Sequence, residues 1–160
     1  SLLCLAASYG DTACVKLLYE RGGNLNEVQP QGQTNVTALE IASWMGHEPV
    51  VNFLLAHGAF FGRALHYAAK AGHSTLVKHL LDCHAHPEMP VDGHTPLLVA
   101  VLSQHGEIIE KLVIAGAKVD TRLDAVVCSK MGLNPDSTVL HYAAQHAFAS
   151  SIQVIVKQWP

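Results

Sequence analysis

The chain repeats a short pattern, and this repetition constrains its fold more than any other feature. The stretch ALHYAAKAGH at residues 64–73 returns as VLHYAAQHAF at residues 139–148. Aligned on the leucine of this pattern, five copies begin at residues 1, 37, 63, 95 and 138. Counted from the start of each copy, position 3 is always leucine, position 6 alanine and position 15 valine or isoleucine. Repetition at this spacing predicts an array of stacked units.

Each copy has the pattern of two short helices. Apolar residues at positions 3, 5 and 6, and again at 14, 15, 18 and 19, follow one helical face each. Glycine at position 10 separates the helices in the first three copies, because glycine adopts the left-handed conformation at little steric cost. Thr37, Thr95 and Thr138 stand where a hydroxyl would cap the first helix. Helices this short are marginal alone, so the copies are expected to stack, with the small alanine at position 6 admitting close neighbours.

These segments resemble the ankyrin repeat. SLLCLAASYGDTACVKLLYERGGNLN (1–26) and DGHTPLLVA (92–100) are similar to the pattern of that family, and the resemblance covers almost the whole chain. It implies an all-α solenoid of stacked helix-turn-helix units with hairpin loops, called fingers, on one side. We expect a single array over residues 1–160, a fragment of a longer protein, with repeats at about 1–36, 37–62, 63–94, 95–137 and 138–160.

The resemblance also implies where a partner binds, because ankyrin repeats usually bind through the fingers and first helices, which line a concave face. Positions 8 and 9 of each copy point into that face in the family. The predicted partner-binding residues are therefore Tyr9, Trp44, Met45, Lys70, Leu102, Gln145 and His146. Since aromatic side chains often anchor interfaces, we expect Tyr9, Trp44 and Met45 to form an apolar patch that receives a partner segment. The alternative is that these side chains pack on adjacent repeats.

Two connections depart from the usual period of about 33 residues. Between the second and third copies the finger is nearly absent, and Phe60 and Phe61 occupy the turn. We expect the two phenylalanines to fill the space of the missing hairpin; alternatively, they expose an aromatic notch beside Trp44. Between the fourth and fifth copies, residues 121–137 form a long loop, which is either an extended finger or a mobile insertion.

The sequence contains many histidines and four cysteines, but their positions do not predict a metal site. Five histidines stand at positions 4 or 11 of the repeat, namely His47, His66, His73, His105 and His141. The remaining cluster, Cys83, His84, His86 and His94, lacks the ligand spacing of a zinc site, so no metal or cofactor is expected. Cys4 and Cys14 fall within predicted helices, while Cys83 ends one and Cys128 lies in a loop. Helical cysteines with this irregular spacing favour buried thiols in a reducing compartment over disulfides.

Composition and motifs exclude several functions. No run approaches 18 apolar residues and no signal peptide opens the chain, so we expect neither membrane insertion nor secretion. The net charge of −3 gives no electrostatic attraction for nucleic acid. No GxSxG, HExxH or phosphate-binding glycine loop is present, so neither enzymatic activity nor a small-molecule substrate is expected. The expected location is intracellular, cytoplasmic or nuclear, or the host-cell cytosol for a bacterial effector.

The sequence therefore predicts a non-enzymatic module that presents a concave surface to a protein or peptide. Two alternatives are a substrate-recruiting arm of a larger enzyme or effector, such as a ligase adaptor or bacterial effector, and an intramolecular scaffold. Proteins similar to this one can also be hydroxylated by an oxygen-dependent asparaginyl hydroxylase. Asn26 and Asp120 match its pattern, each following an aliphatic residue and lying eight residues after a leucine. The alternative role for both is turn stabilisation.

Overall fold

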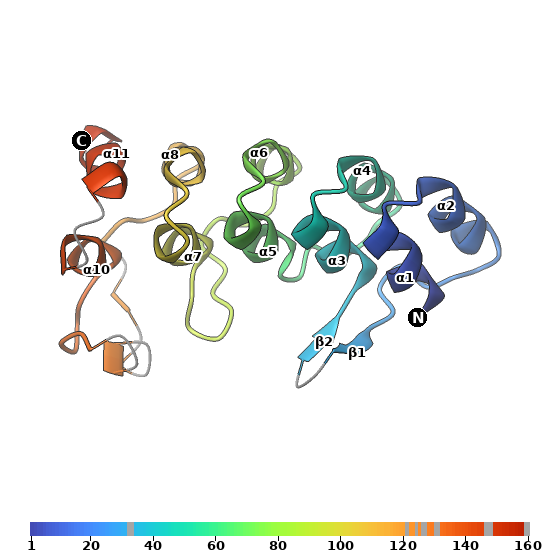
Figure 1. Cartoon of the computed structure of the whole chain (residues 1–160), viewed down its shortest axis with the longest axis horizontal. Helices are drawn as coiled ribbons and strands as arrows, with labels where there is room; N and C mark the ends of the chain where they lie inside the picture. Colours follow the sequence, from blue (N-terminus) through green and yellow to red (C-terminus); the bar gives the residue numbers. More distant parts are fainter. Residues whose placement is uncertain are drawn as a thin grey trace.

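The helices lie in two parallel rows along a solenoid (Figure 1). The computed structural model describes residues 1–31, 34–120, 122–123, 125, 128–129, 132–145 and 149–158. The inner row consists of α1 (Leu2–Tyr9), α3 (Ala38–Met45), α5 (Ala64–Ala71), α7 (Pro96–Leu102) and α10 (Val139–Gln145). The outer row consists of α2 (Thr12–Glu20), α4 (Glu48–Ala56), α6 (Ser74–Asp82), α8 (Gly106–Ile114) and α11 (Ala149–Gln158). The predicted repeat solenoid is confirmed.

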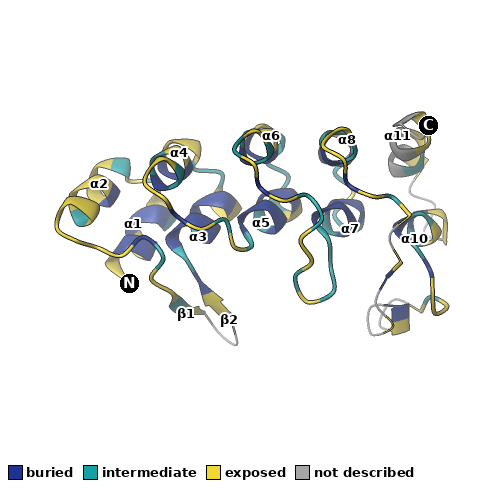
Figure 2. Cartoon of the chain, turned by 180° about the vertical axis from the view of Figure 1, so that it is seen from behind, coloured by how far each residue is buried: buried dark blue, intermediate teal, exposed yellow. Residues whose placement is uncertain are grey.

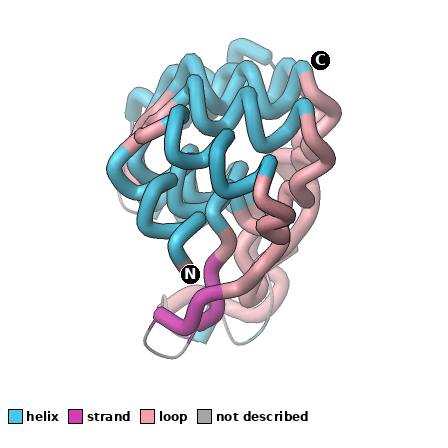
Figure 3. The backbone as a smooth tube through the Cα atoms, turned by 90° about the vertical axis from the view of Figure 1, so that its right-hand side faces the viewer, coloured by secondary structure: helices cyan, strands magenta, loops and turns pink. Residues whose placement is uncertain are grey.

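The fingers leave the inner row on the side opposite the outer row (Figures 1 and 3). In the first finger, β1 (Gln29–Gln31) pairs with β2 (Thr34–Val36) in an antiparallel hairpin. The second finger is closed by a bridge between Val91 and His94. Between the second and third repeats, residues 57–63 lead from α4 to α5 without a finger. The inner row is therefore flanked by fingers on either side of α5.

The hydrophobic core runs from the first repeat to the start of the fifth. Figure 2 shows that α3, α5 and α7 are largely buried, whereas α2, α4, α6 and α8 expose their outward faces. Successive inner helices contact one another, α1 with α3, α3 with α5 and α5 with α7. The alanine at position 6 is buried in every copy, as Ala6, Ala42, Ala68, Ala100 and Ala143. The prediction that a small residue lets neighbouring units approach is thus confirmed.

Threonine caps two of the inner helices as predicted. The Thr37 Oγ1 accepts a hydrogen bond from the Glu40 amide at 3.3 Å, and Glu40 Oε2 accepts one from the Thr37 amide at 3.0 Å. This reciprocal capping box satisfies two amides that a helix start leaves free. Thr95 accepts from the amide three residues later at 3.2 Å. Thr138 differs, since its Oγ1 lies 2.9 Å from Nδ1 of His141.

A histidine at position 11 ties each of three repeats to the one before it. The Nε2 atoms of His47, His73 and His105 lie 3.1, 3.0 and 3.3 Å from the carbonyl oxygens of Ser8, Trp44 and Lys70. We call this contact the histidine clasp. It gives the glycine at position 10 a second role, because a Cβ on Gly46 would lie 2.7 Å from the His73 ring. Gly46 also has a φ of 77°, which other residues rarely adopt.

The four cysteines are all free thiols. Cys4 is buried, as predicted for the cysteines within helices; Cys128 is also buried, and Cys83 at the end of α6 is half-buried. The prediction of burial was wrong for Cys14, which is exposed. Position 14 faces the preceding repeat, and no described residue covers that face in the first copy, whereas Val50 at the same position of the second copy is fully buried.

The connection at 121–137 is closed at its base. Arg122 and Thr138 form an isolated bridge, and Arg122 Nη1 lies 2.9 Å from Asp136 Oδ1. Leu123 and Cys128 are buried and belong to the core. Residues 121, 124, 126–127 and 130–131 lie outside the described part of the chain. That this segment reaches toward a partner as an extended finger stays a prediction.

Candidate protein-binding site

Two adjacent pockets lie between the inner helices and the fingers. The first, of about 350 Å³, lies between α3 and α5 and is lined by Trp44, Met45, Tyr67 and Lys70 among others. The second, of about 360 Å³, lies between α5, α7 and the second finger, and Leu102 lines it together with Tyr67 and Lys70. Because Tyr67 and Lys70 line both pockets, the two form one surface, which we call the inner groove.

Trp44 forms the centre of the α3 side of the groove. Its ring contacts Tyr67 edge-on, with centroids 5.9 Å apart, and the Lys70 Nζ lies 5.6 Å from its centroid. The histidine clasp holds the Trp44 carbonyl through His73. Even so, 39% of Trp44 and 50% of Met45 remain exposed. Packing on the adjacent repeat therefore orients the Trp44 ring while leaving apolar surface open.

An ion pair between buried Glu40 and half-buried Arg63 supports the groove beside Tyr67. Glu40 is 4% exposed, and its Oε1 accepts hydrogen bonds from the backbone amide and the Nε of Arg63 at 2.9 and 3.1 Å. The Arg63 guanidinium also donates to the Asn35 carbonyl of the first finger and lies 5.5 Å from the Tyr67 centroid. The hydrogen bond with Glu40 raises the pKa of Arg63. This network joins the first finger, α3 and α5.

The sequence reasoning missed the roles of Glu40 and Arg63. The available signal was a pair of departures from the repeat pattern. Glu40 stands at position 4, where two other copies have histidine, and Arg63 stands at position 1, where three copies have threonine. Each departure is unremarkable alone, and together they form a salt bridge across 23 residues of sequence.

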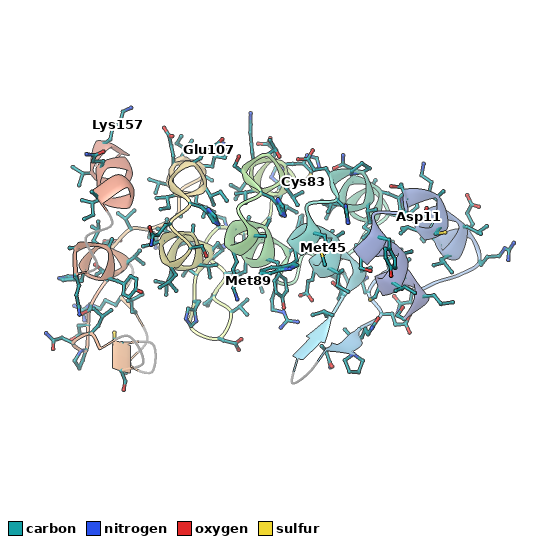
Figure 4. The ribbon with its side chains drawn as sticks, in the orientation of Figure 1. Asp11, Met45, Cys83, Met89, Glu107 and Lys157 are labelled. Atoms are coloured by element: carbon teal, nitrogen blue, oxygen red, sulfur yellow. The ribbon has the colours of Figure 1, made fainter. Side chains whose placement is uncertain are left out.

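The other predicted binding residues are distributed along the array. Lys70 lies in the inner groove, and half-buried Leu102 lines its second pocket. Gln145 is exposed at the end of α10, outside both pockets. His146 lies outside the described residues. Figure 4 labels Met45 in the inner row, where it lines the groove.

Tyr9 belongs to a different surface. It is 78% exposed and lines a separate apolar groove of about 390 Å³ with Leu2, Leu5 and Leu17. In the second copy, the residues at the positions of Leu2, Leu5 and Leu17 are buried or half-buried. Only Met45, at the position of Tyr9, is exposed there. The groove at Tyr9 is thus the face through which later repeats pack on their predecessors. The expected single patch of Tyr9, Trp44 and Met45 was wrong, because Tyr9 does not line the inner groove.

Phe60 and Phe61 line a third groove, of about 730 Å³, beside the outer helices α4 and α6. Phe61 is half-buried and packs against the core, and that it fills the space of the missing hairpin stays a prediction. For Phe60, which is 72% exposed, that prediction was wrong. The alternative of an aromatic notch beside Trp44 was also wrong, because this groove is lined by outer-row residues such as His79 and Cys83.

The residues weighed as zinc ligands are not brought together. Cys83 lies at the end of α6, where its Sγ is 3.7 Å from His79 Nε2, while His94 closes the second finger. Across the described residues, no group of three histidine, cysteine or acidic side chains is arranged to hold a metal ion. Within the same residues, no helix has the length and apolar character needed to cross a membrane.

Asn26 has a structural role that its sequence pattern did not reveal. Its Oδ1 accepts a hydrogen bond from the Phe60 amide at 2.8 Å, which ties the end of the first repeat to the connection before α5. This contact supports the alternative of turn stabilisation. Asp120 is exposed, with no hydrogen bond of this kind among the described contacts. Hydroxylation of Asn26 and Asp120 stays a prediction.

The buried imidazole of His66 should make the array less stable in acid. Its Nε2 donates to the His94 carbonyl at 3.0 Å, and burial lowers its pKa despite that hydrogen bond. The unfolded chain therefore takes up a proton below about pH 6.5 that the folded chain resists, so stability falls as the pH falls below that value. We expect the free energy of unfolding to be lower at pH 5.5 than at pH 7.5, with His66 contributing to the difference.

Urea denaturation at the two pH values checks this expectation. His66→Gln should reduce the difference, because glutamine keeps a donor and does not titrate. The matched control is His84→Asn, which removes an exposed imidazole and suits the positive φ of 69° at that residue. An unchanged pH dependence in His66→Gln would show that other groups cause the acid sensitivity.

The geometry described above matches a known family. The family model for ankyrin repeats matches residues 1–63 and 61–123. The chain therefore belongs to the ankyrin-repeat family, whose repeats are generally protein-interaction modules.

Three curated relatives illustrate the range of proteins that contain similar arrays. The mouse (Mus musculus) protein fem-1 homolog A-like is 37% identical over 48% of this chain and 13% of its own length. A Caenorhabditis briggsae ankyrin repeat and KH domain-containing protein is 32% identical over 74% of this chain and 4% of its own length. A Caenorhabditis elegans homolog of transient receptor potential cation channel subfamily A member 1 is 29% identical over 96% of this chain and 12% of its length. The chain thus spans only a small part of these relatives.

Proposed function

We propose that this chain is a non-enzymatic recognition module that binds a protein or peptide segment in the inner groove. The observation that carries the proposal is the partial exposure of Trp44 and Met45 in a pocket whose walls are held by the histidine clasp and the Glu40–Arg63 pair. Exposed aromatic side chains in pre-ordered pockets are frequent anchors of protein interfaces. Rigid display also reduces the entropy lost when a partner docks.

The proposal sets the module in an intracellular compartment, cytoplasmic or nuclear, with neither nucleic acid nor a small molecule as its ligand. A second candidate is a recruiting arm of a larger enzyme or effector. This second candidate is supported by the curated relatives, because the chain matches only a small part of each and most of each relative's length lies outside the match. The two candidates use the same groove and differ in what is joined to it.

Replacing Trp44 by alanine should weaken partner binding by about 2 kcal/mol, or about 30-fold in Kd, because the indole is the largest exposed apolar group in the groove. Partners are first captured from lysate on the immobilised chain and identified by comparison with a folded Trp44→Ala/Met45→Ala bait. A purified partner is then titrated against the single variant by isothermal calorimetry.

The matched control for this binding experiment is Phe60→Ala. It removes an aromatic side chain that is more exposed than Trp44, 72% against 39%, from the groove beside the outer row. Phe60→Ala should leave the affinity unchanged. Equal weakening by both variants, or by neither, would place the binding site outside the inner groove.

A further inference from the structure

We propose that the inner groove selects an extended peptide segment in which an acidic side chain lies two residues from an aromatic or aliphatic one. This inference rests on the proposed function and adds the chemistry of the partner. The apolar side chain would occupy the pocket between α3 and α5, and the carboxylate would bind the Lys70 ammonium.

The α3–α5 side of the inner groove carries polar groups that have no ion-pair or hydrogen-bond partner within the described part of the chain. Lys70 lines both pockets and forms no ion pair with any described residue. The Trp44 Nε1 and the Tyr67 hydroxyl also have no hydrogen-bond partner among the described residues. Indole and ammonium groups can only donate. The groove therefore presents donors, and a fitting partner has to supply acceptors such as a carboxylate and backbone carbonyls.

No described carboxylate near the groove forms an ion pair with the Lys70 ammonium. Glu40 is buried, and hydrogen bonds from Thr37 and Arg63 occupy both of its oxygens. Asp92 lies in the turn of the second finger and lines only the pocket between α5 and α7. Lys70 lines that pocket as well but forms no ion pair with Asp92, and its ammonium lies over the Trp44 ring, which is a weak partner beside a carboxylate.

The distance between Lys70 and Trp44 sets the spacing of the acidic and apolar side chains in the partner. The Lys70 Nζ lies 5.6 Å from the Trp44 centroid, so the acidic and apolar sites are adjacent. In an extended segment, side chains two residues apart point the same way and are separated by about 7 Å. Because no finger arises between the second and third repeats, such a segment can cross α5 without meeting a hairpin. The charge of Lys70, the spacing between Lys70 and Trp44 and the open path across α5 therefore all favour an extended segment with an acidic and an apolar side chain two residues apart.

A library of random twelve-residue peptides displayed on phage tests the inference with the whole chain as bait. Selected peptides should be enriched in Asp or Glu two positions from an apolar residue. A synthetic peptide from the selection should then bind Lys70→Glu at least about tenfold more weakly than the unaltered chain in fluorescence polarisation. Replacing the acidic residue of the peptide by lysine should restore binding to Lys70→Glu.

The control bait is Lys78→Glu, which makes the same charge change on the exposed side of the outer helix α6 and should bind normally. Peptides that depend on Trp44 but carry no acidic enrichment would overturn this inference while leaving the proposed function intact. Peptides that bind equally well to Trp44→Ala, or recovery no greater than on an unrelated protein, would count against both. Equal losses in Lys70→Glu and Lys78→Glu would show a general charge effect and overturn the inference.

Discussion

Replacing Arg63 by methionine is expected to lower the free energy of unfolding by about 3 kcal/mol. Methionine retains much of the side-chain volume but leaves the Glu40 carboxylate, 4% exposed, without its cation. It also removes the hydrogen bond from the guanidinium to the first finger. A buried charge without a counter-charge is costly, and the two backbone amides that still donate to Glu40 replace only part of its lost hydration. Urea denaturation followed by circular dichroism measures the loss.

Two further variants separate this effect from the mere loss of an arginine. Arg122→Met breaks the ion pair with Asp136, in which both side chains are more than 70% exposed, and should cost no more than about 0.5 kcal/mol. Glu40→Gln combined with Arg63→Met removes the stranded charge and should recover part of the stability. If the double variant is no more stable than Arg63→Met, the unpaired charge is not the cause of the loss.

Replacing Gly46 by alanine should cost about 2–3 kcal/mol of unfolding free energy, the second large effect. Alanine is strained at a φ of 77° by roughly 1 kcal/mol or more. Its Cβ would also lie 2.7 Å from the His73 ring and displace it from the Trp44 carbonyl, a further loss of about 1 kcal/mol. The same urea titration detects this change, and a fall in partner affinity should accompany it because Trp44 lines the groove.

Gly58→Ala isolates the contribution of the clasp. Gly58 has a comparable φ of 85°, and a Cβ there meets no atom within 4 Å. Only the backbone strain should therefore appear, at about 1 kcal/mol. Were the two alanine variants equally destabilised, the His73 ring would have to move at no cost, and the clasp would contribute little.

Local features of this fold were predictable from the sequence because they repeat. The stacked pairs, the threonine caps on α3 and α7 and the glycine at the end of the inner helices each depend on residues within one copy. Every copy supplies the same short-range signal, so a helix of eight residues is recognised five times over. The burial of the alanine at position 6 follows from the same repeated pattern of apolar residues.

The site was predictable only in part, because it depends on contacts between copies. The placement of Trp44, Met45 and Lys70 follows from their position in the repeat. Tyr9 has a comparable position but lies on a face that no described residue covers, so its surroundings differ. The Glu40–Arg63 pair could not be foreseen, because pairing a buried acid with one particular base requires the distance between two repeats to be known.

The histidine clasp has a mechanical consequence for the inner groove. Each clasp is a short link between neighbouring repeats, and two of its acceptors are the carbonyls of Trp44 and Lys70. A segment too wide for the space between α3 and α5 would have to stretch the His73 link and pass the deformation to adjacent repeats. Widening the groove therefore requires several repeats to move together. This resistance favours narrow partner segments over wide ones.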